Sequence, residues 1–192
     1  MRFRSSLLFA GILAVSLSSA TSAIPVIDQQ NTVGGELSGP STSLGQSFTP
    51  TLNSIRIADF SLLTEGVAST LHLDLFAGAG YTGALLGASS PVTFTNTLLQ
   101  TIEFTFPMSI ALVPGNQYTI RLTLDSGDPY RAEFSSTNPY AGGTAFSDQG
   151  GAVAPVDLVF AEGIPEPSVT ALLLLGCLGI AGACGRRFLA RA

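Results

Sequence analysis

Hydrophobic and polar residues alternate through the middle of the chain with the period of two that is typical of a β-strand with one buried face. The clearest run is Tyr118–Asp125, and Ser69–Phe76 and Thr101–Phe106 repeat the pattern. In the clearest run the expected inward positions are Tyr118, Ile120, Leu122 and Leu124. The pattern predicts strands over Ser54–Leu63, Ser69–Phe76, Pro91–Thr97, Thr101–Phe106, Tyr118–Asp125 and Val156–Ala161.

Three local features are expected around these strands. Within Ser54–Leu63 the hydrophobic positions change parity, and a β-bulge near Ala58 and Asp59 would explain the change. Asn31–Gly45 is rich in Gly, Ser and Thr and is predicted to be a loop. Val113–Asn116 has the sequence VPGN, which predicts a tight turn before the next strand.

The predicted strands define the fold class of the central part of the chain. None of its segments has the helical spacing of about 3.6 residues, and Gly, Pro and Asn separate the strands. Short strands joined by such turns favour an all-β, antiparallel two-sheet sandwich. A jelly roll is the preferred arrangement, and an immunoglobulin-like sandwich is the alternative.

The first 23 residues have the pattern of a secretory signal peptide. Two arginines precede the apolar run Leu7–Leu17, and small residues follow up to Ala23. Basic, apolar and cleavage regions therefore come in the order of such peptides. We predict that residues 1–23 are a signal peptide cleaved after Ala23, with cleavage after Ala20 as the alternative.

The last 29 residues combine a proline motif, an apolar segment and a basic end. The motif IPEPS occupies residues 164–168, and residues 169–185 carry no charge. A helix over residues 169–185 approaches the roughly 30 Å thickness of bilayer hydrocarbon, so one transmembrane helix is predicted there. Three arginines in the tail 186–192 predict that this end stays in the cytoplasm. The two prolines of the motif hold the residue between them in an extended conformation.

Together these three parts resemble the PEP-CTERM sorting signal of Gram-negative bacteria, over residues 164–192 only. Isoleucine stands where the motif more commonly begins with valine. The resemblance implies that an exosortase-type membrane protease recognises Pro165, Glu166 and Pro167 and removes the helix. The precursor would then lie in the inner membrane, and the product at the cell-envelope surface or in the extracellular exopolysaccharide matrix. A plain C-terminal membrane anchor is the alternative.

Between the two signals we predict one extracytoplasmic domain, residues 24–163. Both cysteines, Cys177 and Cys184, fall outside it, so it must fold without disulfides. The domain has twelve acidic residues, three arginines and no lysine, a formal charge of −9. Nucleic acids and anionic lipids bind basic surfaces and are therefore unsuitable partners. Exopolysaccharide, neutral sugars and divalent cations are suitable partners, although solubility explains the charge equally well.

Few residues in this domain suit catalysis or metal binding. His72 is the only histidine, and neither a Gly-x-Ser-x-Gly motif nor a cysteine nucleophile accompanies it. His72 is therefore interpreted as a surface residue of a polar sheet face, and no catalytic residue is assigned. One histidine is also too few for a zinc site. Asp125 and Asp128 flank a glycine turn and are the candidate calcium ligands, with solvated hairpin acids as the alternative.

Tyrosines are the candidate sugar-binding residues, because the chain has no tryptophan. Tyr81, Tyr130 and Tyr140 fall in Gly- and Pro-rich segments that are predicted to be loops, where ligands commonly bind. Tyr118 is instead expected to point inward. The sequence thus predicts an exported, non-enzymatic surface or matrix protein. A carbohydrate-binding module is the first alternative, and a secreted hydrolase is the second and less favoured one.

Overall fold

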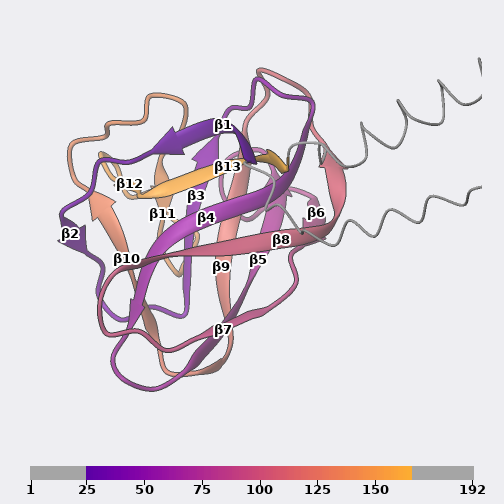
Figure 1. Cartoon of the computed structure of the whole chain (residues 1–192). Helices are drawn as coiled ribbons and strands as arrows, with labels where there is room; N and C mark the ends of the chain where they lie inside the picture. Colours follow the sequence, from indigo (N-terminus) through magenta and orange to yellow (C-terminus); the bar gives the residue numbers. More distant parts are fainter. Residues whose placement is uncertain (1–24, 166–192) are drawn as a thin grey trace, which may run out of the picture. The chain divides into compact units, whose positions relative to one another are not determined.

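Figure 1 shows the computed structural model of the chain, which describes residues 25–165. These residues form thirteen strands and contain no helix. The expected signal peptide 1–23, transmembrane helix 169–185 and basic tail 186–192 lie outside the described residues. In the described part, no helix has the length and hydrophobicity needed to cross a membrane.

One sheet contains both the first and the last described strand, which lie side by side (Figure 1). Its strands are β1 (Pro25–Asn31), β2 (Glu36–Leu37), β4 (Ser54–Thr64), β8 (Gln100–Ala111), β10 (Tyr130–Ser135), β12 (Asp157–Leu158) and β13 (Phe160–Pro165). The hydrogen-bonded order is β1-β13-β4-β10-β12, with β8 paired to β4 and β2 paired to β10. Every pairing is antiparallel.

The other sheet is built around two long central strands. Its strands are β3 (Ser43–Phe48), β5 (Ser69–Ala77), β6 (Leu85–Ala88), β7 (Val92–Phe94), β9 (Tyr118–Gly127) and β11 (Ala145–Phe146). The order is β11-β3-β9-β5-β6, and β7 also pairs with β5. All of these pairings are antiparallel as well.

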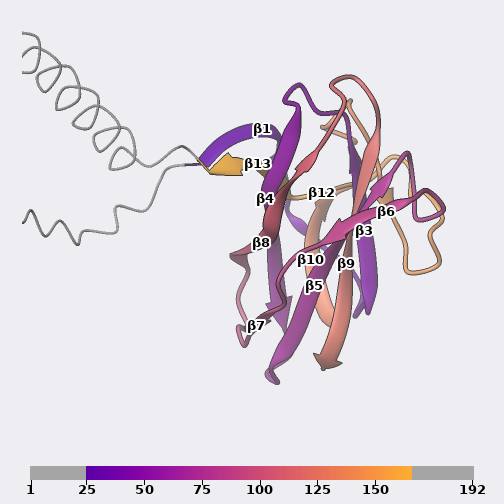
Figure 2. The same cartoon turned by 90° about the vertical axis from the view of Figure 1, so that its right-hand side faces the viewer.

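Figure 2 shows the two sheets from the side. Hydrophobic side chains fill the space between them. Phe60 of β4 and Phe160 of β13 lie with their ring centroids 6.3 Å apart. Alternate residues of β5 and β9 are fully buried in the same core: Leu71, Leu73, Leu75, Ile120 and Leu122. Burial of such a side chain contributes about 1.5–3 kcal/mol. The alternation in the sequence therefore sets the inner face of each sheet.

The predicted all-β, antiparallel two-sheet sandwich is confirmed, and its four longest strands are β4, β5, β8 and β9. The strand predicted over Pro91–Thr97 is shorter, since β7 covers only Val92–Phe94. The strand predicted over Val156–Ala161 is divided between β12 and β13. Val159 lies between the two, where its amide nitrogen donates to the Glu133 carbonyl oxygen at 2.9 Å.

The loop prediction for Asn31–Gly45 is wrong at both ends. Asn31 is the last residue of β1, and β3 already begins at Ser43. Between them, Glu36 and Leu37 form β2 against β10. These strands form because distant partners supply their hydrogen bonds, which a local excess of Gly, Ser and Thr does not reveal.

The bulge expected near Ala58 and Asp59 is also misplaced. The register between β4 and β8 shifts between Ile55, which pairs with Ile110, and Ile57, which pairs with Thr105. The surplus residues therefore lie on β8. Ile55 and Ala58 are three residues apart and both belong to the core, as does Phe60. The inward parity of β4 therefore changes between Ile55 and Ala58.

Candidate functional site

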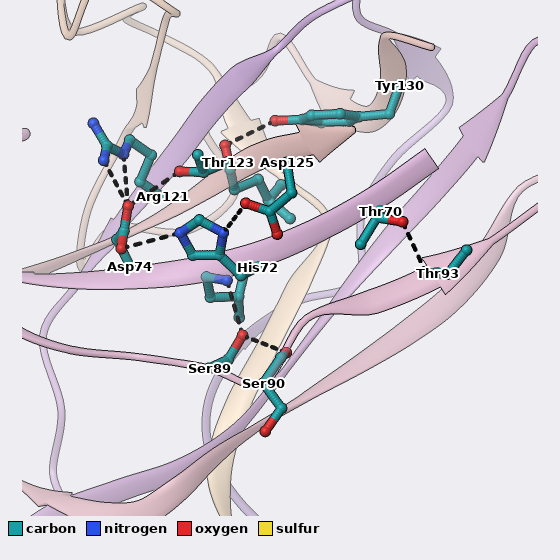
Figure 3. A network of polar contacts seen from close by, with 12 residues as sticks. Thr70, His72, Asp74, Ser89, Ser90, Thr93, Arg121, Thr123, Asp125 and Tyr130 are labelled. Carbon is teal, nitrogen blue, oxygen red and sulfur yellow. Dashed lines mark hydrogen bonds and ion pairs between the residues drawn. The ribbon is translucent and has the colours of Figure 1, made fainter. Parts of the chain in front are cut away.

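A cluster of polar side chains that includes the histidine lies on the outer face of the second sheet (Figure 3). Its members alternate with core residues: His72 and Asp74 on β5, and Arg121, Thr123 and Asp125 on β9. The antiparallel register places His72 opposite Thr123 and Asp74 opposite Arg121. The same alternation that buries the leucines of β5 thus gathers these polar side chains on one surface.

The side chains form a continuous chain of contacts across the two strands (Figure 3). His72 lies between two carboxylates, with Nδ1 2.7 Å from Asp125 Oδ1 and Nε2 3.3 Å from Asp74 Oδ1. Asp74 Oδ2 accepts hydrogen bonds from Arg121 Nη2 at 2.6 Å and Nε at 3.2 Å. Thr123 Oγ1 donates to the same oxygen at 3.1 Å. Asp74 is therefore the common acceptor of the cluster.

Arg121 is fixed by aromatic rings as well as by its ion pair. Its guanidinium carbon lies 5.0 Å from the ring centroid of Phe76 and 5.2 Å from that of Tyr81. Tyr81 in turn packs against Phe146 of β11, with centroids 5.9 Å apart. A guanidinium over aromatic faces is held by cation–π attraction. The segment after β5 thus covers this end of the polar surface.

This arrangement links the strands β5 and β9. Within residues 25–165, no hydroxyl group is hydrogen-bonded to His72, so the histidine has no adjacent nucleophile to activate. The same residues contain no group of three or more His, Cys, Asp or Glu that could hold a metal ion. The cluster does tie β5 to β9 through charge-assisted hydrogen bonds.

The two candidate calcium ligands are engaged in different contacts. The carboxylate of Asp125 is hydrogen-bonded to His72. Asp128 uses its backbone carbonyl oxygen, which accepts a hydrogen bond from Ser69 Oγ at 2.6 Å. Gly127 between them has a φ of 94°, the conformation that a glycine turn requires. Calcium binding by this pair stays a prediction.

The three candidate sugar-binding tyrosines do not share one surface. Tyr130 is the first residue of β10 and is fully buried, so its expected place in an exposed loop is wrong. Its hydroxyl donates to the Leu122 carbonyl oxygen at 3.1 Å, and burial raises its pKa. Tyr81 is partly buried beneath Phe146 and Arg121. Tyr118 points inward as predicted and is buried.

Tyr140 lies in a loop, as predicted, but its ring is packed inward. Only 9% of the residue is exposed, and the ring meets Phe160 edge-on with centroids 5.2 Å apart. Its hydroxyl accepts from the Thr49 amide at 3.1 Å and donates to Gln29 Oε1 at 3.0 Å. Burial raises the pKa of Tyr140. Its side chain therefore bridges β1 and the core.

An apolar pocket of about 270 Å³ opens elsewhere, beside β2, β11 and β12. No charged side chain lines it. Its walls include Leu37, Leu44, Phe134, Phe146, Val153 and Leu158. Such a wall lacks the convergent polar groups that orient a sugar.

Two further placements concern the end of the described chain. Pro165 of the proline motif is the last residue of β13 and pairs with Pro25 of β1. Glu166 and Pro167 lie outside the described residues. Glu162 of β13, which sequence reasoning missed, is fully buried. Its only signal in the sequence is that it shares the strand parity of Phe160.

Comparison with known proteins adds no assignment to this geometry. No protein-family model matches the chain, and no curated protein matches it significantly.

Proposed function

We propose that this chain is an exported, non-enzymatic surface or exopolysaccharide-matrix protein that is sorted through a C-terminal PEP-CTERM signal. Its partners are an exosortase-type membrane protease and, after processing, exopolysaccharide. The precursor is held in the inner membrane, and the product leaves for the cell-envelope surface or the matrix of a Gram-negative cell.

The observation that carries the proposal is the pairing of β1 with β13. Pro25, two residues beyond the expected signal-peptide cleavage site, pairs with Pro165 of the proline motif. The sandwich between them buries its own core. A domain closed in this way needs neither flanking segment for its fold, which is what removal of both segments demands.

We further propose the jelly-roll arrangement for the sandwich. In chain order, β3, β4 and β5 alternate between the sheets, and β8, β9 and β10 do so again. Consecutive strands stay in one sheet at β1 and β2, at β5, β6 and β7, and at β12 and β13. Strands that cross between sheets at most connections favour a jelly roll, whereas an immunoglobulin-like sandwich joins several neighbours of the same sheet by hairpins.

The polar cluster supports a non-enzymatic role. His72 is held between two carboxylates, and Asp74 is in turn occupied by Arg121 and Thr123. A hydrolase would need a nucleophile within about 3 Å of the base. Sugar binding has less support than surface display, since Tyr130 is fully buried and Tyr140 is turned into the core.

Intact-mass measurement of the protein isolated from its native cells tests the proposal. We expect a chain that begins at Ile24 and lacks residues 186–192. A precursor from cells without the protease is the control and should retain the tail. A native product that still carries Arg186 to Ala192 would contradict the sorting account.

A further inference from the structure

Gly163 of β13 faces β1 at a point that has no room for a side chain. The antiparallel register of the two strands runs from Pro25 opposite Pro165 to Asn31 opposite Phe160. A Cβ atom at Gly163 would lie 2.0 Å from the carbonyl oxygen of Val26. Only glycine permits this contact, so the pairing of β1 with β13 depends on the glycine at position 163.

Glu162, next to that glycine, carries a carboxyl group with no partner. The residue is fully buried, and neither side-chain oxygen has a hydrogen-bond partner among the described residues. It shares the inward face of β13 with Phe160, which belongs to the core. An ionised carboxylate in such a place is strongly disfavoured, because nothing replaces its lost hydration.

Asp28 of β1 is the acidic neighbour of Glu162 and is held as an anion. It sits where the β1 register shifts, between Ile27 and Gln29. Its Oδ2 accepts from the backbone amides of Thr51 at 2.8 Å and Leu52 at 2.9 Å. The Thr51 hydroxyl and the Gln29 amide donate to Oδ1. Burial raises the pKa of Asp28, but these hydrogen bonds outweigh it and lower the pKa overall.

The other groups around Glu162 supply no positive charge. Ala58 of β4 lies directly opposite it. Tyr140 uses its hydroxyl on Gln29 and Thr49, and Asp157 of β12 accepts from the Tyr140 amide. Burial and the charge of Asp28 raise the pKa of Glu162 to about 8.

Two of the three arginines of the described chain are paired with other carboxylates, and the third is exposed to solvent. Arg121 pairs with Asp74, and Arg131 pairs with Glu65. Arg56 is exposed on β4. A divalent cation is a poor substitute at this place, since the Asp28 oxygens already accept four hydrogen bonds. A proton is the counter-charge that fits.

We propose that Glu162 is protonated in the folded protein beside the ionised Asp28, and that this singly charged pair forms a pH-operated latch between β1 and β13. When the pH rises, the proton passes to water and the two carboxylates repel each other. The strand β13 then separates from β1. This inference rests on the proposed function, because β13 ends at Pro165, where the sorting motif begins. A protease needs an extended, unpaired segment at that place.

Hydrogen exchange of the full chain in detergent micelles, followed by mass spectrometry from pH 6 to pH 9, tests the latch. After correction for intrinsic exchange, we expect protection of β1 and β13 to fall about tenfold per pH unit up to about pH 8 and then to level off. Peptides from β5 and β9 are the internal reference and should not follow this curve.

Four variants, one of them an exposed control, make the test specific. Glu162→Gln should abolish the pH dependence, whereas the exposed control Glu36→Gln should leave it unchanged. Asp28→Asn should move the plateau to a lower pH, because the neighbouring charge is gone. Gly163→Ala should release β1 at every pH, through its clash with Val26.

The results that overturn the latch are distinct from those that overturn the sorting function. Unchanged pH dependence in both Glu162→Gln and Asp28→Asn would refute it. Restored protection at pH 9 on addition of CaCl₂ would replace it with a cation site. If the latch behaves as expected but native cells retain the tail, the sorting proposal fails and the latch remains.

Discussion

At the scale of single residues, Asp74 shows how the polar face of the second sheet is held. It is only 5% exposed, yet it serves Arg121, Thr123 and His72 at once. Asp125 makes a single contact with the same histidine and is far more exposed. Hydrogen bonds to a charged group matter most where water cannot replace them.

Replacing Asp74 by Asn should therefore lower the free energy of unfolding by about 1–3 kcal/mol, because Arg121 loses its charged partner. The matched change Asp125→Asn should cost less than about 1 kcal/mol, since that contact lies at the surface. Urea unfolding of both variants beside the unaltered protein measures the difference. Equal losses would show that Asp74 is not the central acceptor.

Single tyrosines also show what a local pattern can reveal. Tyr118 stands in an alternating run, so its inward direction could be predicted. Tyr130 follows the residues Gly127, Asp128 and Pro129, which suggest a loop. It is nevertheless a strand residue, because it pairs with Thr64 of β4, far away in the sequence. Burial set by a distant strand leaves no periodic trace near the residue.

At the scale of elements, β3 is the clearest case of a strand hidden by buried polar residues. Gln46 and Ser47 are both fully buried, which removes the contrast between its two faces. Gln46 Nε2 donates to Asp157 Oδ1 at 2.9 Å, and its Oε1 accepts from the Leu158 amide at 2.8 Å. The long strands β4, β5 and β9 were predictable because hydrophobic residues mark their inner faces, whereas only the alternating first half of β8 was predicted and its mostly exposed second half, residues 107–111, was missed. The polar cluster was only half predictable, since its cross-strand register is not encoded locally.

Replacing Gln46 by Met should cost about 2–4 kcal/mol, because Asp157 Oδ1 and the Leu158 amide would both be buried without a partner. Gln117→Met is the matched control at an exposed site and should cost less than about 0.5 kcal/mol. Thermal unfolding monitored by circular dichroism measures both. A mild effect at Gln46 would mean that β12 does not depend on this bridge.

At the scale of the whole molecule, acidity governs stability. Twelve acidic residues and three arginines lie between Pro25 and Pro165. Burial and the charge of Glu103 raise the pKa of Asp59 to about 6, and Glu162 is raised to about 8. Both values exceed the ordinary ones, 3.8 and 4.5. The folded state therefore keeps protons that the unfolded chain has already lost.

Thermal stability should accordingly fall as the pH rises from about 5 to about 8, through the raised pKa values of Asp59 and then Glu162. Asp28 acts in the opposite direction, since its lowered pKa gives stability that is lost only in more acidic solution. Calorimetry across this range measures the trend. Added NaCl should recover part of the loss at high pH by screening repulsion. A melting temperature that rises steadily towards pH 8 would contradict this picture.

The pairing of Pro25 with Pro165 has one more consequence, for engineering. A short peptide joining these two positions would turn the backbone into a ring. New termini opened in the exposed turn at residues 65–68 would then give a circular permutant with the same two sheets. Such a permutant would place both chain ends at the far end of β4. The former ends, Pro25 and Pro165, would be joined covalently.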